Sequence, residues 1–179
     1  MDLESFSEQT KIKINASFNY ARENNFAYFI PLHLLITLIK NDNLVKNTLR
    51  YFKVDIKLLL KQSLLISNKE KKNTSPPQIQ GNLVLLLQEA NKKIKVKGNK
   101  KIETNLILLE LCSDLSPITK ELLEKNNFYY HNLEAYIEKI LSKEKNNFES
   151  IKKYTLDLTD LSKKNKVDPI IGREVEIKR

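Results

Sequence analysis

Glycine, proline and cysteine are scarce in this chain. Its 179 residues include three glycines, five prolines and one cysteine. So few turn-forming residues favour helices over a sheet-rich fold. The single cysteine, Cys112, excludes an internal disulfide and fits a reducing compartment, for which the cytoplasm is the default.

Long apolar runs and targeting signals are also missing. No uninterrupted apolar run approaches the length that crosses a membrane, so no membrane partner is expected. The N-terminal segment MDLESFSEQ is acidic and polar, which fits neither a secretory signal nor an arginine-rich transit peptide. With 41% hydrophobic and 30% charged residues, the chain suits one domain of ordinary size followed by a tail.

Side chains suited to catalysis or metal binding are few. The two histidines, His33 and His131, and Cys112 are too dispersed for a protein-only metal site. His33 lies in the most apolar segment, where a hydrogen-bonded core residue is expected, and Cys112 is expected to be a buried, inert thiol. No Ser/His/Asp spacing or carboxylate pair stands out. The sequence therefore predicts no catalytic residue and no metal site.

Positive charge is in excess and unevenly spread. The net charge is +9, and residues 91–101, NKKIKVKGNKK, contain lysines without one acid. Such a cluster fits either a nucleic-acid or other anionic partner, or a solvated helix end where lysines suit the helix dipole. No arginine or aromatic residue lies between these lysines, which weakens the nucleic-acid reading.

Apolar spacing predicts four helices in the first half of the chain. Ser7 caps the first, Pro31 opens the second, Leu44 lies in the third and Asp55 caps the fourth. The second, LHLLITLIK, is apolar nearly all round and is expected to be a central buried helix. Residues 67–81 read as a polar connection.

The same spacing predicts four helices in the second half. Their markers are Leu83, Thr104 as an N-cap, Ser116-Pro117 followed by an inward Ile118, and His131 or Asn132. The halves also echo each other: Leu34 aligns with Leu106 at an offset of 72 (106 − 34), and Leu49 with Leu123 at 74 (123 − 49). We therefore expect an all-α domain over residues 1–145, made of two pseudo-repeated four-helix halves that pack as one eight-helix unit, followed by a linker helix.

The C-terminal segment carries the most specific pattern. Residues 151–165 have the stripe of a short amphipathic helix, and the string K-K-Y-T-x-D-L-T…K-x-D-P-x-I-G-R-E-x-E-I-x-R follows from Lys152 to Arg179. This string resembles the beginning of the first ATPase domain of Clp-type AAA+ chaperones, most of all the ClpB-like disaggregases. Pro31-Leu32-His33-Leu34-Leu35 is similar to the second helix of the Clp N-terminal domain.

The resemblance implies a domain organisation for the C-terminal part of the chain. Residues 146–179 are expected to be the linker and the start of the first AAA+ domain, truncated before the ATP-binding loop G-x-x-x-x-G-K-[ST], which is absent. Ile170, Ile171, Gly172 and Arg173 are expected beside the adenine of ATP in the full-length protein. ATP and Mg are therefore expected cofactors of the full-length protein, with none in this fragment, which is not expected to be an enzyme by itself.

The resemblance also implies a binding function. In that family the N-terminal domain sits on a hexameric ring, catches unfolded or aggregated proteins or adaptor proteins, and passes them toward the pore. The implied groove residues are Ser7, Glu89, Lys93, Asn99, Asn105 and Leu106. Ser7 and Leu106 keep the family's residue types, whereas the two charged and two amide residues replace apolar and acidic ones. Either the groove is more polar than usual or the alignment of the fifth helix slips.

Three alternatives stay open. A ClpA- or ClpC-like unfoldase domain feeding a peptidase is the first. Phosphorylated arginine, which some ClpC domains bind through glutamates, is not an expected ligand, because those positions correspond to Leu32 and Asn105. A stand-alone Clp adaptor is the second alternative, and a basic helical nucleic-acid-binding module using Lys92–Lys101 is the third.

Overall fold

The computed structural model describes residues 4–97 and 101–143. The chain divides into two units, Met1–Ile137 and Glu138–Arg179, and the second is described only over residues 138–143. The predicted linker helix over 151–165, the predicted nucleotide-adjacent residues 170–173 and Asn99 therefore lie outside the described residues.

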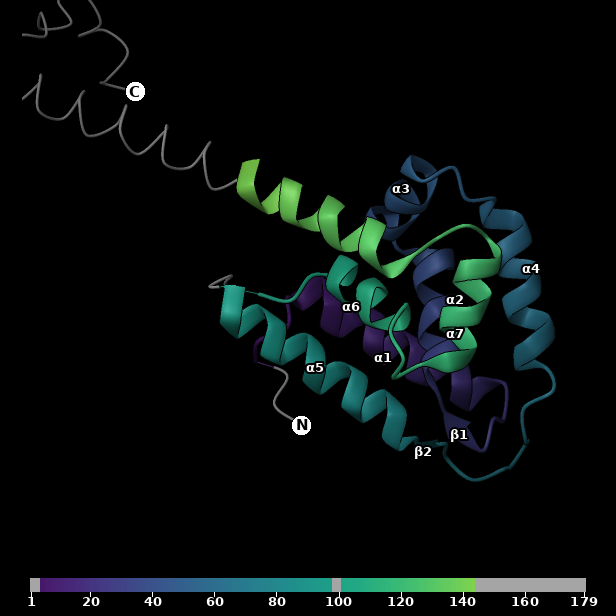
Figure 1. The fold of residues 1–179 in the computed structure, drawn as a ribbon. Coiled ribbons are helices and arrows are strands. Elements are labelled where there is room, and N and C mark those ends of the chain that lie inside the picture. The colour runs from purple at the N-terminus through teal and green to yellow at the C-terminus, as the bar shows by residue number, and fades with distance from the viewer. Residues whose placement is uncertain (1–3, 98–100, 144–179) are drawn as a thin grey trace, which may run out of the picture. The chain divides into compact units, whose positions relative to one another are not determined.

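Helices make up most of the first unit (Figure 1). The described helices are α1 (Glu8–Glu23), α2 (Pro31–Asn41), α3 (Asn43–Tyr51), α4 (Ile56–Ser67), α5 (Gly81–Lys97), α6 (Thr104–Leu111), α7 (Pro117–Lys125) and a last helix over residues 130–143. Two short strands, β1 (Tyr28–Phe29) and β2 (Gln78–Ile79), pair in parallel. The predicted all-α, eight-helix class is confirmed, and the strands are an addition to it.

The two most apolar helices, α2 and α6, form the centre of the core. All side chains from Pro31 to Ile39 are buried in α2, and all those from Thr104 to Leu111 are buried in α6. Figure 1 shows α2 in the middle of the unit, and it packs against α1, α3, α4, α6 and α7. A helix that is apolar all round needs neighbours on every side, which is why the other helices surround these two.

Short parallel pairings join the two halves of the unit. Phe6, before α1, bridges to Ile102, before α6. Phe29, before α2, pairs with Ile79, before α5. The amide of Ile102 donates to the carbonyl of Ser5 at 2.8 Å in the first pairing, and the amide of Gln80 donates to the carbonyl of Phe29 at 3.0 Å in the second, so both pairings contain backbone hydrogen bonds. In each of these pairings, one segment comes from the first half and the other from the second half.

The predicted helix starts are mostly confirmed. Ser7 is the N-cap of α1, and its Oγ accepts a hydrogen bond from the Thr10 amide at 3.2 Å. Asp55 caps α4 in the same way, accepting from the Leu58 amide at 3.0 Å. Pro31 is the first residue of α2, where its missing N–H costs nothing.

Two local predictions are wrong. Thr104 is not a cap but the first buried residue of α6, because Glu103 adopts the extended conformation of the N-cap and makes no side-chain cap bond. Ile118 does not face inward: its side chain is 46% exposed. The buried face of α7 carries Thr119, Leu122 and Leu123, and Ile118 precedes Thr119 by one residue, or about 100° around the helix.

His33 is a core residue, as predicted. Its Nδ1 accepts a hydrogen bond from the Ile30 amide at 3.4 Å, and its ring stacks on Phe26 at a centroid distance of 4.3 Å. Burial, with a smaller effect from the positive charge of Lys72, lowers the pKa of His33 to about 4. The imidazole is therefore neutral near pH 7 and acts in packing.

Candidate functional site

An apolar groove of about 520 Å³ lies between α1 and α5, next to the two strands. Its lining is Lys11, Ile12, Ile14, Asn15, Phe18, Phe29, Ile79, Leu83, Val84 and Leu87. Leu83 and Leu87 are buried, whereas Ile12 and Ile79 are 56% and 58% exposed. Large apolar side chains that stay this exposed around a hollow are the usual mark of a surface that takes a partner.

Helix and strand geometry together produce this groove. Phe18 reaches from α1 to Phe29 of β1, where the two rings meet edge to face with centroids 5.6 Å apart. The pairing of β2 with β1 places Ile79 beside Phe29 and so brings it to the groove. Lys11 and Asn15 supply the polar part of the lining, and an apolar floor with a few polar groups is the common composition of binding sites.

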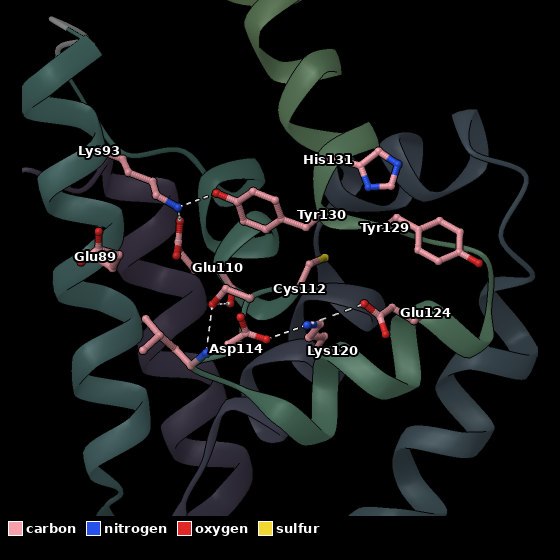
Figure 2. A pocket seen from close by; sticks show the side chains of 12 residues that line it. Glu89, Lys93, Glu110, Cys112, Asp114, Lys120, Glu124, Tyr129, Tyr130 and His131 are labelled. Atoms are coloured by element: carbon pink, nitrogen blue, oxygen red, sulfur yellow. Dashed lines mark hydrogen bonds and ion pairs between the residues drawn. The ribbon is translucent and has the colours of Figure 1, made fainter.

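A second hollow, of about 580 Å³, is much more polar (Figure 2). Its lining comes from α5, from the end of α6, from α7 and the turn before it, and from the start of the last helix: Glu89, Lys93, Glu110, Cys112, Ser113, Asp114, Leu115, Lys120, Glu124, Tyr129, Tyr130 and His131. We call it the acidic pocket, because its carboxylates outnumber its ammonium groups by four to two.

A buried ion pair forms one wall of the acidic pocket. Lys93 Nζ lies 2.6 Å from Glu110 Oε1 and 2.6 Å from the Tyr130 hydroxyl, as the dashed lines in Figure 2 show. The Glu110 side chain is only 1% exposed, and that of Lys93 is 25% exposed. Tyr130 in turn donates to Glu134 at 3.3 Å, so the pair belongs to a network that links α5, α6 and the last helix.

Burial decides the electrostatics of this pair. Loss of water raises the pKa of Glu110 above its usual value, and the bond to Lys93 only partly opposes that shift. Burial by itself would lower the pKa of Lys93, but hydrogen bonds to Glu110 and Tyr130 outweigh it and hold the pKa above its usual value. The ammonium of Lys93 is therefore charged near pH 7.

Half-exposed charges and aromatic rings form the rest of the acidic pocket. Lys120 Nζ lies 2.6 Å from Asp114 Oδ1 and 4.0 Å from Glu124 Oε1. The rings of Tyr129 and His131 stack with centroids 5.9 Å apart. This side of the pocket is open to solvent, since Asp114 is almost fully exposed.

Cys112 is buried at the base of the acidic pocket. Its Sγ donates to the Leu108 carbonyl at 3.3 Å. Burial, together with the nearby charges of Glu110 and Glu124, raises the pKa of the thiol far above its usual range. The predicted burial of Cys112 is confirmed, and a thiol held in this form is expected to be a poor nucleophile.

The structure brings only some of the predicted groove residues together. Glu89 and Lys93 line the acidic pocket. Ser7 donates from its Oγ to Glu103 Oε2 at 3.1 Å, Asn105 accepts a bond from Thr48 at 3.1 Å, and Leu106 is 5% exposed. These three lie at the starts of α1 and α6, and Asn99 is outside the described residues. Whether any of them touches a client stays a prediction.

Several lining residues were missed from the sequence. Ile12 and Ile79 belong to a helix and a strand far apart in the chain, and no local pattern joins them. Glu110 could have been singled out from the sequence, because it is the one acid in the apolar segment TNLILLEL of α6. A lone acid in such a helix requires a buried partner, and Lys93 provides it.

The described residues contain no group of three or more histidine, cysteine or acidic side chains placed to hold a metal ion. Over the same residues, no helix combines the length and apolar character needed to cross a bilayer. The basic segment 91–101, which begins within α5, is partly engaged within the protein: Lys92 pairs with Glu89 at 3.0 Å, and Lys101 donates to the carbonyl of Glu4 at 2.6 Å.

Known proteins share both sequence and fold with this chain. Residues 5–126 match the Clp repeat (R) N-terminal domain. The chaperone protein ClpB of Rickettsia bellii is 28% identical over 195 aligned residues, which cover 100% of this chain and 22% of that protein. The chain thus spans about a fifth of the length of such relatives, and the match extends over residues 151–179, where the predicted resemblance was strongest.

Solved structures of similar fold are N-domains of the same kind. The Hsp104 N-terminal domain from Candida albicans has a TM-score of 0.65 and 18% identity over 74% of this chain and 88% of that one. A ClpV N-domain solved in complex with a VipB peptide has a TM-score of 0.64 and 21% identity over 79% of this chain and 92% of that one. The family match covers well over half of the chain, and the fold agrees with it. The chain therefore belongs to the Clp repeat (R) N-terminal domain family.

Proposed function

We propose that residues 1–145 form the client- or adaptor-binding domain of a ClpB-like AAA+ chaperone. In this proposal the domain binds unfolded or aggregated protein, or an adaptor, and passes it to a hexameric ATPase ring. The curated relatives support the ClpB-like assignment, because ClpB of Rickettsia bellii aligns with the whole chain. Residues 146–179 are then the linker and the start of the first ATPase domain.

The apolar groove carries this proposal. Ile12 and Ile79 remain more than half exposed although they flank an apolar hollow of about 520 Å³. Covering the exposed part of one such side chain stabilises a complex by about 0.8–1.5 kcal/mol, so a short apolar peptide segment that covers several of them gains useful affinity here. Apolar burial sets few demands on sequence, which suits a domain that accepts many unfolded clients.

A relative supports the same class of ligand. The ClpV N-domain, of similar fold, has been solved with a peptide. Lys92, Lys93 and Lys101 are engaged by Glu89, Glu110 and a backbone carbonyl, an arrangement that favours a protein ligand over nucleic acid. We extend the proposal to the full-length protein: ATP and Mg are its cofactors, Ile170–Arg173 lie beside the adenine, and it works in the cytoplasm.

The test replaces one groove side chain. Ile12→Glu places a charge in the groove, and we expect the affinity for a permanently unfolded model protein to fall about tenfold or more. Leu65→Glu is the matched control, because Leu65 has the same exposed fraction, 56%, and lies on α4 outside the groove lining. Fluorescence anisotropy measures binding, and circular dichroism checks that helicity persists. Equal binding by both variants would show that the groove is not the client site.

A further inference from the structure

Glu110 is a buried carboxylate with only one of its two oxygens hydrogen-bonded among the described residues. It accepts one bond, from Lys93 to Oε1 at 2.6 Å. Among the described residues Oε2 has no partner, although the side chain is 1% exposed. A buried carboxylate oxygen without a donor costs free energy, so this site retains capacity for a further donor.

The pocket around Glu110 is acidic within a basic protein. Glu89, Glu110, Asp114 and Glu124 line it against Lys93 and Lys120, whereas the whole chain has a net charge of +9. Low-dielectric walls strengthen the field of the buried carboxylate in the hollow. Figure 2 shows these side chains arranged around the pocket, together with the two tyrosine rings. The site therefore attracts a positively charged group.

The shape of the site favours one kind of cation. Lys93 is a point charge and serves a single carboxylate oxygen. A guanidinium is planar and donates to both oxygens of a carboxylate at once, which would also satisfy Oε2 of Glu110. Tyrosine faces add to this, since Lys93 Nζ already lies 5.0 Å from the centroid of the Tyr130 ring. The described residues hold no metal-ligand cluster, so a metal ion fits less well.

We infer that the acidic pocket binds an arginine side chain of a partner polypeptide. The guanidinium pairs with Glu110, and the ring of Tyr130 lies beside it, next to Lys93. Lys93 shifts toward Glu89, which lies one helical turn earlier on α5, pairs with Lys92 at 3.0 Å and has a side chain that is 36% exposed. The exposed carboxylate of Asp114 draws the cation toward the opening. This site is separate from the apolar groove, with which it shares no lining residue.

A titration with a minimal probe tests the inference. N-acetyl-arginine N-methylamide is added to the isotope-labelled 179-residue chain, and backbone amide shifts are followed by NMR. We expect saturable shifts at Ser113, Leu115 and Tyr129. The neutral citrulline analogue should give none, and the lysine analogue should bind about tenfold more weakly, because an ammonium lacks the paired donors.

Variants locate the binding atom. Glu110→Gln should weaken arginine binding about tenfold or more, since it removes the buried charge. Glu121→Gln is the matched control on α7, because Glu121 is exposed and pairs with Lys125 outside the pocket. If Glu110→Gln does not fold, Tyr130→Leu and Asp114→Asn replace it, and each should weaken binding about threefold.

The outcomes separate this inference from the proposed function. Ile12→Glu should leave arginine binding unchanged while it lowers the affinity for unfolded protein about tenfold or more. Equal shifts with the citrulline analogue, no saturable shift at the pocket amides, or undiminished binding by folded pocket variants would each overturn the inference, and none of them would bear on the apolar groove.

Discussion

Lys53 and Asn127 lie 74 positions apart (127 − 53) and adopt the same left-handed backbone conformation, with φ of 59° and 58°. Each follows a nine-residue helix, α3 or α7. The next amide, of Val54 or Phe128, donates back to the carbonyl of Leu49 or Leu123 at 3.0 Å in both cases. The structure thus repeats a helix-ending motif at the offset that aligns these two leucines in the sequence.

Replacing Lys53 by glycine should stabilise the domain. A side chain at positive φ is strained, and glycine removes that strain. We expect Lys53→Gly to raise the free energy of unfolding by about 0.5–1 kcal/mol, and Asn127→Gly to raise it less, because asparagine tolerates this conformation. Urea denaturation measures both. Lys61→Gly, in the middle of α4, is the control and should lower stability by about 0.7 kcal/mol; a loss of stability in Lys53→Gly would refute the explanation.

Glu110 should make stability depend on pH. Because burial raises its pKa in the folded chain, the folded state holds this proton more tightly than the unfolded state does. The resulting stability is fully present below the unfolded pKa, about 4.3, and is lost as the pH rises through the folded pKa. Over that interval, unfolding free energies of the parent should fall relative to those of Glu110→Gln, which does not titrate.

Urea denaturation at a series of pH values measures this difference. Glu124→Gln serves as the control, because Glu124 lies at the same pocket but its side chain is 42% exposed. A constant difference between the parent and Glu110→Gln across the acidic range would contradict the burial argument.

Cys112 should resist thiol reagents in the folded chain. It is buried, and its pKa is raised, so the reactive thiolate is scarce even at mildly alkaline pH. We expect labelling by a disulfide-exchange reagent at pH 8 to be slower by about two orders of magnitude or more than in the chain unfolded in urea, because reaction requires opening of the structure. Fast labelling without denaturant would show that the end of α6 opens locally.

Local signals in the sequence predicted much of the fold. The Ser7 and Asp55 caps, Pro31 at the start of α2, and the buried positions of α2 and α6 follow from neighbouring residues alone, and all are confirmed. The prediction for Thr104 was wrong because threonine is a favoured N-cap, whereas the N-cap of α6 is Glu103, one residue earlier, and Thr104 is buried as the first residue of the helix.

Features that depend on distant segments could not be predicted in this way. Strands β1 and β2 are two residues each and meet only because the helices around them pack. The Lys93–Glu110 pair joins two helices across 17 positions, and no helical spacing predicts such a contact. The apolar groove likewise combines Ile12 with Ile79, whose proximity is set by the tertiary fold.

The two parallel pairings have a consequence for synthesis. Phe6 pairs with Ile102 and Phe29 pairs with Ile79. In both cases a segment of the first half can form its backbone hydrogen bonds only after residues of the second half have been synthesised. A chain emerging from the ribosome exposes the backbone groups before α2 until Ile79 has been added, and those before α1 until Ile102 has been added. The backbone hydrogen bonds before α1 and α2 therefore form only after the first four helices have been synthesised.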